Sequence, residues 1–144
     1  MSDSADLRPV PALPFIHIDE SGRASLRGSR CGACGAVLLG KPLACSACGS
    51  RRDLLPIELS NRGTLHAYTI VHRSFPGVKT PFVAAIIDLE GGGSLKGTLL
   101  DVAPDPSTVR FDMPLEVIFR DSGQRDATGR PYLTYFFTAR EAAT

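Results

Sequence analysis

The chain has 144 residues and a hydrophobic fraction of 43%, which is enough for the packed core of one ordinary domain or two small ones. Its formal net charge is only +1, and because no stretch of about 18 consecutive apolar residues occurs, we expect no membrane-spanning segment. The first residues include acids and form no apolar h-region, unlike a secretory signal, so we expect the protein in the cytoplasm.

Proline marks the first segment of the chain, at Pro9, Pro11 and Pro14. Prolines at this density favour extended or disordered backbone and oppose a regular helix. We therefore assign residues 1–14 to a disordered or extended lead-in.

The strongest motif lies in residues 15–56, where CGAC at 31–34 and CSAC at 45–48 hold all four cysteines of the chain. A tight turn lets both thiolates of a pair face one metal, and two such turns complete the tetrahedral shell of a structural Zn²⁺. Gly35 and Gly49 follow the second cysteine of each pair, where glycine tolerates a positive φ. The motif predicts a zinc ribbon that holds one structural Zn²⁺ through Cys31, Cys34, Cys45 and Cys48.

Other uses of the cysteines explain this motif less well. A redox CxxC pair or two disulfides would not account for two similar glycine-terminated turns in a chain with no other cysteine. Iron can fill the same soft tetrahedral cage when the protein is produced recombinantly. Catalytic zinc keeps an open position for water, whereas four thiolates leave none, so we expect the metal to serve folding only.

Charge is distributed unevenly along the chain. Residues 21–52 carry six Lys or Arg and no acid, giving +6, and four thiolates on one Zn²⁺ would add −4 + 2 = −2, leaving +4. Residues 53–144 carry nine Lys or Arg and eleven Asp or Glu, which gives −2. Counter-charge around an anionic zinc centre is one explanation of the basic segment.

The remaining part, residues 57–144, shows β-strand patterns and no long helical periodicity. Alternating or continuous apolar runs predict strands at 62–73, 81–90, 94–102, 114–121 and 132–140. A GGGS turn at 91–94 makes the second and third strands a hairpin, and 122–130 reads as a polar loop. The spacer 104–114 is too rich in proline for a long helix.

Five short strands with a central hairpin suit a small closed barrel of the OB-fold type. A small open sheet or a sandwich is the competing architecture, and periodicity alone does not decide between them. Simple alternation along the first strand separates Leu65, Ala67, Thr69 and Val71 from His66, Tyr68, Ile70 and His72. The predicted fold is mostly β: a four-cysteine zinc ribbon followed by a five-stranded OB-fold barrel over residues 57–144.

No set of residues predicts catalysis. His66 and His72 share a strand face, but no Ser or Cys nucleophile stands in a recognisable elbow, and His17 is isolated. Solvated strand positions explain the acidic residues Glu58, Asp88, Glu90 and Glu116. The triple glycine at 91–93 lacks the Lys-Ser/Thr of a phosphate loop. We therefore expect no catalytic residue.

Binding of single-stranded nucleic acid is an alternative function. Its candidate stacking residues on strands are Tyr68, Phe82, Phe119, Tyr135 and Phe136. However, the barrel segment is net negative and nucleic-acid modules are usually distinctly basic, so we do not favour this function.

The order of RCGACG, KPLACSACGS, LSNRGTLHAYTIVHR, PFVAAIIDLEGG and VRFDMPLEVIF resembles the DUF35 OB-fold family over roughly residues 15–140. That family joins an N-terminal rubredoxin-like zinc ribbon to an OB-fold. The resemblance implies that the four cysteines ligate metal and that no catalytic residue carries over. Relatives often have a fuller helical segment before the ribbon, whereas ALPFIHIDESGRASL is short and holds Pro14, so a partner interface formed by that segment would differ.

Many members of this family are accessory subunits of acyl-CoA enzymes, paired with thiolases, hydroxymethylglutaryl-CoA synthase or MaoC-like hydratases that hold the catalytic groups. The resemblance therefore implies a non-catalytic, zinc-binding subunit that braces a thiolase-like or MaoC-like hydratase partner. The basic ribbon would suit either the phosphates of coenzyme A or an acidic partner surface. A stand-alone acyl-CoA binder is the second alternative.

Overall fold

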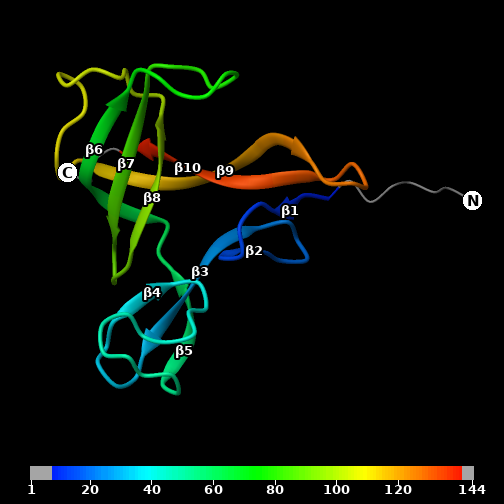
Figure 1. The fold of residues 1–144 in the computed structure, drawn as a ribbon, viewed down its shortest axis with the longest axis vertical. Coiled ribbons are helices and arrows are strands. Elements are labelled where there is room, and N and C mark those ends of the chain that lie inside the picture. Colours follow the sequence, from blue (N-terminus) through cyan, green and yellow to red (C-terminus); the bar gives the residue numbers. More distant parts are fainter. Residues whose placement is uncertain (1–7, 141–144) are drawn as a thin grey trace, which may run out of the picture.

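The computed structural model describes residues 8–140, which form ten β-strands and no helix. Figure 1 shows the four-cysteine ribbon segment at one end of the long axis and a barrel at the other. The strands are β1 Val10–Pro11, β2 Ile16–Ile18, β3 Ala24–Cys31, β4 Val37–Leu39, β5 Leu54–Leu59, β6 Arg62–Val71, β7 Phe82–Leu89, β8 Ser94–Leu100, β9 Pro114–Arg125 and β10 Pro131–Ala139. Within residues 8–140, no helix is long and apolar enough to cross a membrane.

Strand β3 is the centre of the ribbon sheet. It pairs antiparallel with β2 through Ala24–Leu26 and with β4 through Gly28–Arg30, and β5 pairs along Leu26–Cys31. Gly28 permits this packing, because a Cβ there would lie 2.6 Å from the carbonyl oxygen of Leu38. The predicted ribbon segment is thus a small antiparallel sheet, and its central strand ends at the first cysteine, Cys31.

The barrel consists of the five strands β6 to β10, and its pairings form a closed ring. β7 pairs with β6 and β8, β9 pairs with β6 and β10, and β10 also pairs with β8. The β8–β10 pairing is parallel, whereas the other four are antiparallel. This is the strand connectivity of a five-stranded Greek-key barrel, and it agrees with the OB-fold prediction rather than with an open sheet.

The hairpin of β9 and β10 extends well past the barrel (Figure 1). β9 continues to Arg125, so the loop predicted at 122–130 shrinks to the turn after Arg125. The sequence underestimated this strand because Ser122, Gly123 and Gln124 have low β-propensity. They form a bulged stretch between Asp121, which pairs with Leu133 of β10, and Arg125, which pairs with Pro131. Parallel pairing of Val10 and Pro11 with Tyr132 and Leu133 attaches β1 to the same hairpin.

The predicted lead-in, residues 1–14, is only partly within the described chain. Residues 1–7 lie outside it. From residue 8 onward the backbone is extended rather than disordered where β1 pairs with β10, and Ala12 N–H donates to the carbonyl of Leu133 at 2.9 Å. The predicted boundary between the ribbon segment and the barrel segment, at residue 56, lies inside β5, which continues to Leu59.

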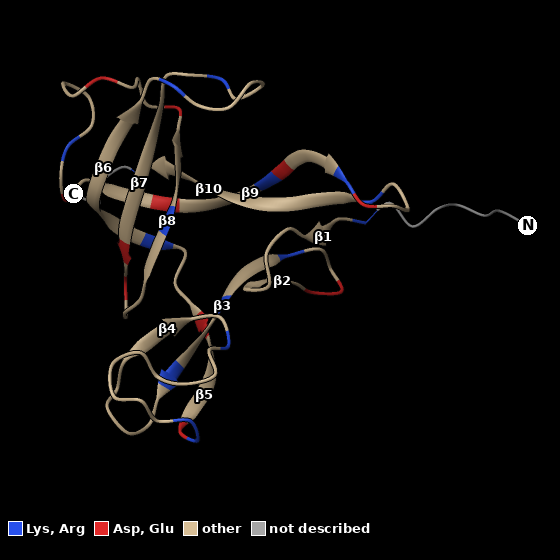
Figure 2. Ribbon diagram, in the orientation of Figure 1, with Lys and Arg blue, Asp and Glu red and all other residues tan. Residues whose placement is uncertain are grey.

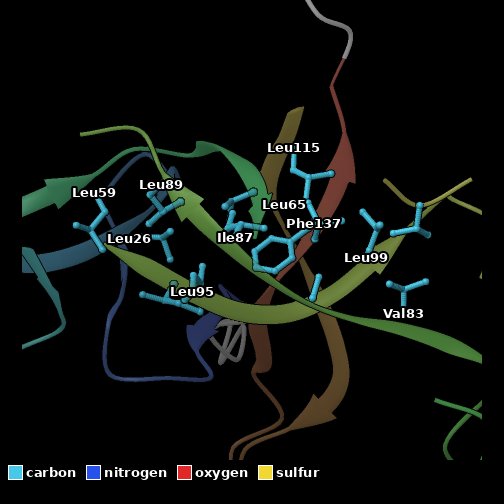
Figure 3. Packing of buried hydrophobic residues seen from close by; sticks show 14 residues of the cluster. Leu26, Leu59, Leu65, Val83, Ile87, Leu89, Leu95, Leu99, Leu115 and Phe137 are labelled. Atoms are coloured by element: carbon cyan, nitrogen blue, oxygen red, sulfur yellow. The ribbon is translucent and has the colours of Figure 1, made fainter. Parts of the chain in front are cut away.

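The hydrophobic core fills the barrel and continues to the ribbon. Phe137, Leu65, Ile87 and Leu115 are fully buried and cluster around the ring of Phe137 (Figure 3). Ile16, Leu26 and Leu59 of the ribbon sheet belong to the same buried cluster. The two parts therefore share one core.

One detail of β6 contradicts the simple alternation predicted for it. A β-bulge at His66 places two residue steps of β6, Leu65 to Ala67, opposite one step of β7, Ile87 to Ile86. The extra residue shifts the alternation, so Tyr68 and Ile70 pack against the core with Leu65. The prediction that Leu65, Ala67, Thr69 and Val71 share one face of the strand is therefore wrong for the residues after the bulge.

Candidate metal centre

Two turns of the same geometry carry the cysteines. In the first, Gly35 N–H donates to the carbonyl of Cys31 at 2.7 Å, and Cys31 N–H donates to that of Ala36 at 2.8 Å. In the second, Gly49 N–H donates to the carbonyl of Cys45 and Cys45 N–H donates to the carbonyl of Ser50, both at 2.8 Å. The glycines have φ of +79° and +82°, a region that other residues rarely adopt. The matching hydrogen bonds explain why the two short motifs have the same residue pattern.

The four sulfurs converge at one point. All lie within 4.8 Å of one another, and the Sγ atoms of Cys31 and Cys48, like those of Cys34 and Cys45, are 3.6 Å apart. A tetrahedral zinc–thiolate shell with Zn–S of about 2.3 Å requires sulfurs roughly 3.8 Å apart. A disulfide would need about 2.05 Å, and all four cysteines are free. The spacing therefore fits a metal cage better than disulfides.

The ribbon sheet fixes this cage in place. Cys31 is the last residue of β3 and pairs with Leu54 of β5, and Gly32 N–H donates to the carbonyl of Asp53 at 2.7 Å. Cys31 and Cys45, the first cysteine of each turn, are buried, whereas Cys34 and Cys48 are exposed. One side of the centre thus rests on the sheet and the other faces solvent.

The environment of the thiols would favour a bound cation. Hydrogen bonding from the backbone N–H of Cys48, the largest contribution, lowers the pKa of Cys45 to about 7. At Cys48 the N–H of Ser50 acts to lower the pKa, but neighbouring thiols, Cys31 foremost, outweigh it and raise the pKa to about 12. Four crowded thiols resist shared ionisation, and a divalent cation removes that repulsion.

The residues present thus fit a tetrahedral metal ion. The structure brings together the four cysteines that the motif singled out, at a spacing and with a sulfur donor set that suit Zn²⁺. Such an ion would supply the link between the two turns. Four sulfurs around it would leave no position for substrate, so the arrangement can stabilise the ribbon but offers no Lewis-acid chemistry.

The histidines do not form a catalytic set. His66 Nδ1 lies 3.0 Å from Asp88 Oδ2, and both side chains are more than half exposed. Ser94 Oγ donates to Asp88 Oδ1 at 3.3 Å, so the hydroxyl meets the carboxylate rather than the imidazole. A nucleophile activated by histidine needs the hydroxyl on the imidazole. His17 and His72 are also exposed, on β2 and just after β6.

The acidic candidates form surface contacts. Glu58 Oε2 is 3.8 Å from Arg23 Nη2, and Glu90 Oε1 is 3.4 Å from Arg140 Nη2. Glu116, the remaining candidate, lies opposite Arg62 in the β6–β9 pairing. These positions agree with solvated strand residues and bring no two of the carboxylates together in an acid–base pair.

The aromatic residues considered for base stacking are used within the fold. Tyr68, Phe119 and Tyr135 pack against the barrel core, and Tyr68 also contacts Phe111 with ring centroids 5.4 Å apart. Burial raises the pKa of Tyr135, whose hydroxyl donates to the carbonyl of Lys96. Phe82 and Phe136 are half-buried on β7 and β10.

Sequence reasoning missed a groove on the ribbon sheet. It has a volume of about 670 Å³ and is lined by residues of β2, β3, β4 and β5, such as His17 and Arg27, and by residues next to these strands, such as Lys41. Arg27 and Lys41 belong to the acid-free segment 21–52, which was the only signal in the sequence. The groove itself could not be predicted, because its walls come from separated strands.

The structure also exposes several large apolar side chains. The most exposed are Leu43 at 93%, Phe75 at 82%, Phe111 at 65% and Leu55 at 59%. Phe75 lies in the loop between β6 and β7, and Phe111 lies in the loop between β8 and β9. Such side chains mark a surface that contacts another protein where they form a contiguous apolar patch.

Comparison with known protein families gives a match over residues 56–120 to the C-terminal OB-fold domain of ChsH2. The matched segment extends from β5 through most of β9. The DUF35 domain-containing scaffold protein of Methanocaldococcus jannaschii is 35% identical over 107 residues, covering 72% of each chain.

Two relatives are subunits of acyl-CoA enzymes by name. The benzoylsuccinyl-CoA thiolase subunit BbsA of Geobacter metallireducens is 30% identical over 85 residues, covering 55% of this chain and 57% of BbsA. A protein of Thermomonospora curvata named "Probable enoyl-CoA hydratase alpha subunit" is 27% identical over 119 residues. That match covers 80% of this chain but only 37% of the longer relative.

Among solved structures, the Ltp2-ChsH2(DUF35) aldolase contains a chain with the same fold. The superposition has a TM-score of 0.62, with 24% sequence identity, and covers 80% of this chain and 84% of the other. The architecture of ribbon and barrel is therefore shared with a known structure.

Proposed function

Because the chain belongs to the DUF35 OB-fold family, we propose that it is a non-catalytic accessory subunit of an enzyme complex that processes acyl-CoA thioesters. The similarity to a scaffold protein over 72% of both chains carries this proposal. The thiolase subunit and the hydratase subunit among its relatives support the acyl-CoA class of substrate.

The arrangement of residues supports a partner-binding role rather than catalysis. The histidines and carboxylates form surface pairs, while Leu43, Phe75 and Phe111 project large apolar groups into solvent. A subunit that braces an enzyme needs such surfaces, because burying them supplies the favourable free energy of association.

Within this function, the partner is a thiolase-like or MaoC-like hydratase enzyme that holds the catalytic groups, and the complex works in the cytoplasm. Cys31, Cys34, Cys45 and Cys48 bind one structural Zn²⁺ per chain, which fixes the ribbon in the shape the partner recognises. Acyl-CoA is a second candidate ligand at the contact between the two subunits.

Affinity isolation tests this proposal. The tagged chain is purified from its native host at moderate salt with nuclease treatment, and co-purifying proteins are identified by mass spectrometry. We expect a thiolase-like or hydratase-like enzyme in near-stoichiometric amount. The isolated chain should turn over no acyl-CoA, and the recovered partner should lose activity or stability without it.

The same preparation separates the two alternatives. Recovery of nuclease-sensitive material alone, with oligonucleotide affinity that falls steeply with salt, would favour nucleic-acid binding. Saturable binding of acetyl-CoA by the isolated chain, with no enzyme recovered, would favour a stand-alone acyl-CoA binder.

A further inference from the structure

The groove on the ribbon sheet combines apolar walls with positive charge. Arg27 lies on β3 and Lys41 follows β4, and His17 on β2 adds an imidazole. Its apolar lining consists of Pro14, Phe15, Leu39, Pro42 and Pro56. No carboxylate is among the residues that line it.

The floor of the groove is rigid and its backbone groups are already paired. Arg27 N–H donates to the carbonyl of Phe15 at 2.7 Å, and Gly40 N–H donates to that of Arg27 at 2.9 Å. Ser29 Oγ donates to the carbonyl of Gly40 at 2.7 Å from a buried position. Because these backbone groups are satisfied, recognition of an occupant depends on side chains, which means charge and apolar contact.

Within residues 8–140, neither Arg27 nor Lys41 forms an ion pair. The acid opposite Arg27 in the sheet, Glu58, lies 3.8 Å from Arg23 instead. Figure 2 shows both signs on the ribbon as well as on the barrel, but residues 21–52, which include Arg27 and Lys41, contain no acid. The groove therefore presents two positive charges that are not engaged in ion pairs within the described chain.

We propose that this groove is a docking site for an acidic peptide segment with apolar side chains, supplied by the partner enzyme. Charge complementarity selects the acidic residues, and the proline and Phe15 walls accept the apolar ones. The volume of about 670 Å³ suits a few side chains of an extended segment. This inference rests on the accessory-subunit function proposed above and adds where, and by what chemistry, the partner is recognised.

The small number of charges favours a peptide over a single phosphate group. Among the described residues, Arg27 and Lys41 are the only Lys or Arg residues that line the groove, beside mostly apolar side chains. Tight phosphate sites usually converge several donors on the same oxygens. The aromatic ring in the groove, Phe15, packs on Tyr135 with centroids 5.7 Å apart, which limits its use for stacking a base.

A matched pair of double variants tests the groove. Arg27→Gln with Lys41→Gln removes two positive charges from its lining, whereas Arg51→Gln with Arg52→Gln removes two from the same ribbon outside it. All four side chains are exposed, so neither variant should disturb the core. Metal content and the unfolding midpoint of each variant verify the fold.

The probe is a fluorescein-labelled peptide, DLEFDLEF, measured by anisotropy on the full metal-loaded chain, with KLKFKLKF as its charge-reversed control. We expect saturable binding of the acidic peptide only, weakened about tenfold or more in the groove variant and less than about twofold in the other. Backbone amide NMR shifts should concentrate at Gly28, Gly40 and Lys41.

Equal weakening by both variants would overturn the proposal, since net charge alone would then explain binding. Shifts away from the groove, or displacement of the peptide by free coenzyme A at equal concentration, would also overturn it. The proposed function stands or falls separately: co-purification of the partner enzyme at wild-type level by the groove variant would reject the docking site and keep the accessory-subunit role.

Discussion

Val37 of the ribbon lies directly against Gly92 of the barrel, so close that a Cβ on Gly92 would be 2.8 Å from Val37 Cγ2. Gly92 belongs to the triple-glycine turn between β7 and β8, which the sequence presents as a simple hairpin turn. The turn has a second role, because the absence of a side chain on Gly92 leaves room for Val37 between the ribbon and the barrel.

The first prediction concerns this contact. Gly92 has φ of +116°, so alanine there is strained in addition to meeting Val37. We expect Gly92→Ala to lower the free energy of unfolding by about 2 kcal/mol or more, measured by urea denaturation. Gly91→Ala, with φ of +83° and open space around it, is the control and should cost about 1 kcal/mol. Equal losses would show that the contact is unimportant, and Val37→Ala should recover part of the Gly92→Ala loss.

The second prediction concerns the metal. We expect wild-type protein to hold about one Zn²⁺ per chain and Cys45→Ser to hold a small fraction of that, by elemental analysis. Loss of the ion should release the ribbon, so amide exchange at Ser29 should accelerate more than at Ile87 in the barrel. Ser46→Ala, in the same turn, is the control and should retain metal. Full retention by Cys45→Ser would reject the four-cysteine site.

The third prediction tests the absence of a catalytic histidine. The exposed His66–Asp88 pair has no nucleophile on the imidazole, so His66→Ala should change the turnover of the assembled complex by no more than a few-fold. The free energy of unfolding should fall by less than about 1 kcal/mol, as expected of an exposed pair. A loss of about 10³-fold in turnover with normal assembly would instead assign general acid–base work to His66.

The fourth prediction concerns acid sensitivity of the β9–β10 turn. Hydrogen bonds from the Thr128 side chain and from the backbone N–H of Arg130 lower the pKa of Asp126. Since the folded-state pKa is depressed, the stabilisation is present above the unfolded pKa of about 3.9 and is lost as pH falls through the folded value.

Asp126→Asn keeps an acceptor oxygen but removes the charge, so its stability should lack this dependence. The wild-type protein should exceed the variant in urea midpoint at pH 6, and the gap should narrow towards pH 3. The cysteine centre affects the stability of both proteins equally, so comparing the two at each pH cancels its contribution to the pH dependence of the urea midpoint. A gap that is constant with pH would contradict the prediction.

Local patterns in the sequence predicted much of this architecture. The alternation and turn signals placed β6, β7, β8 and β10 within about two residues of their ends, and the glycine-terminated motifs predicted the two cysteine turns. These features depend on neighbouring residues, which is why the sequence carries them. The role of the four cysteines as metal ligands stays a prediction.

The features that were missed depend on distant parts of the chain. The bulge at His66 depends on the register with β7, and β9 continues through Gly123 because β10 lies beside it. Likewise, Arg27 and Lys41 could be recognised as a pair only after β3 and β4 had been placed together around the groove. Sequence patterns give no register between strands, and register decides each of these details.

The position of β10 has a consequence for how the protein is made. β10 pairs with β1, β8 and β9, all of which precede it in the chain. During synthesis the ribbon sheet is complete once Leu59 has left the ribosome, whereas the barrel keeps open strand edges until β10 emerges. The strands of the ribbon can therefore pair before the barrel closes, although their shared core is completed only with the barrel. Premature termination before Pro131 would release a chain with exposed strand edges that is prone to aggregate.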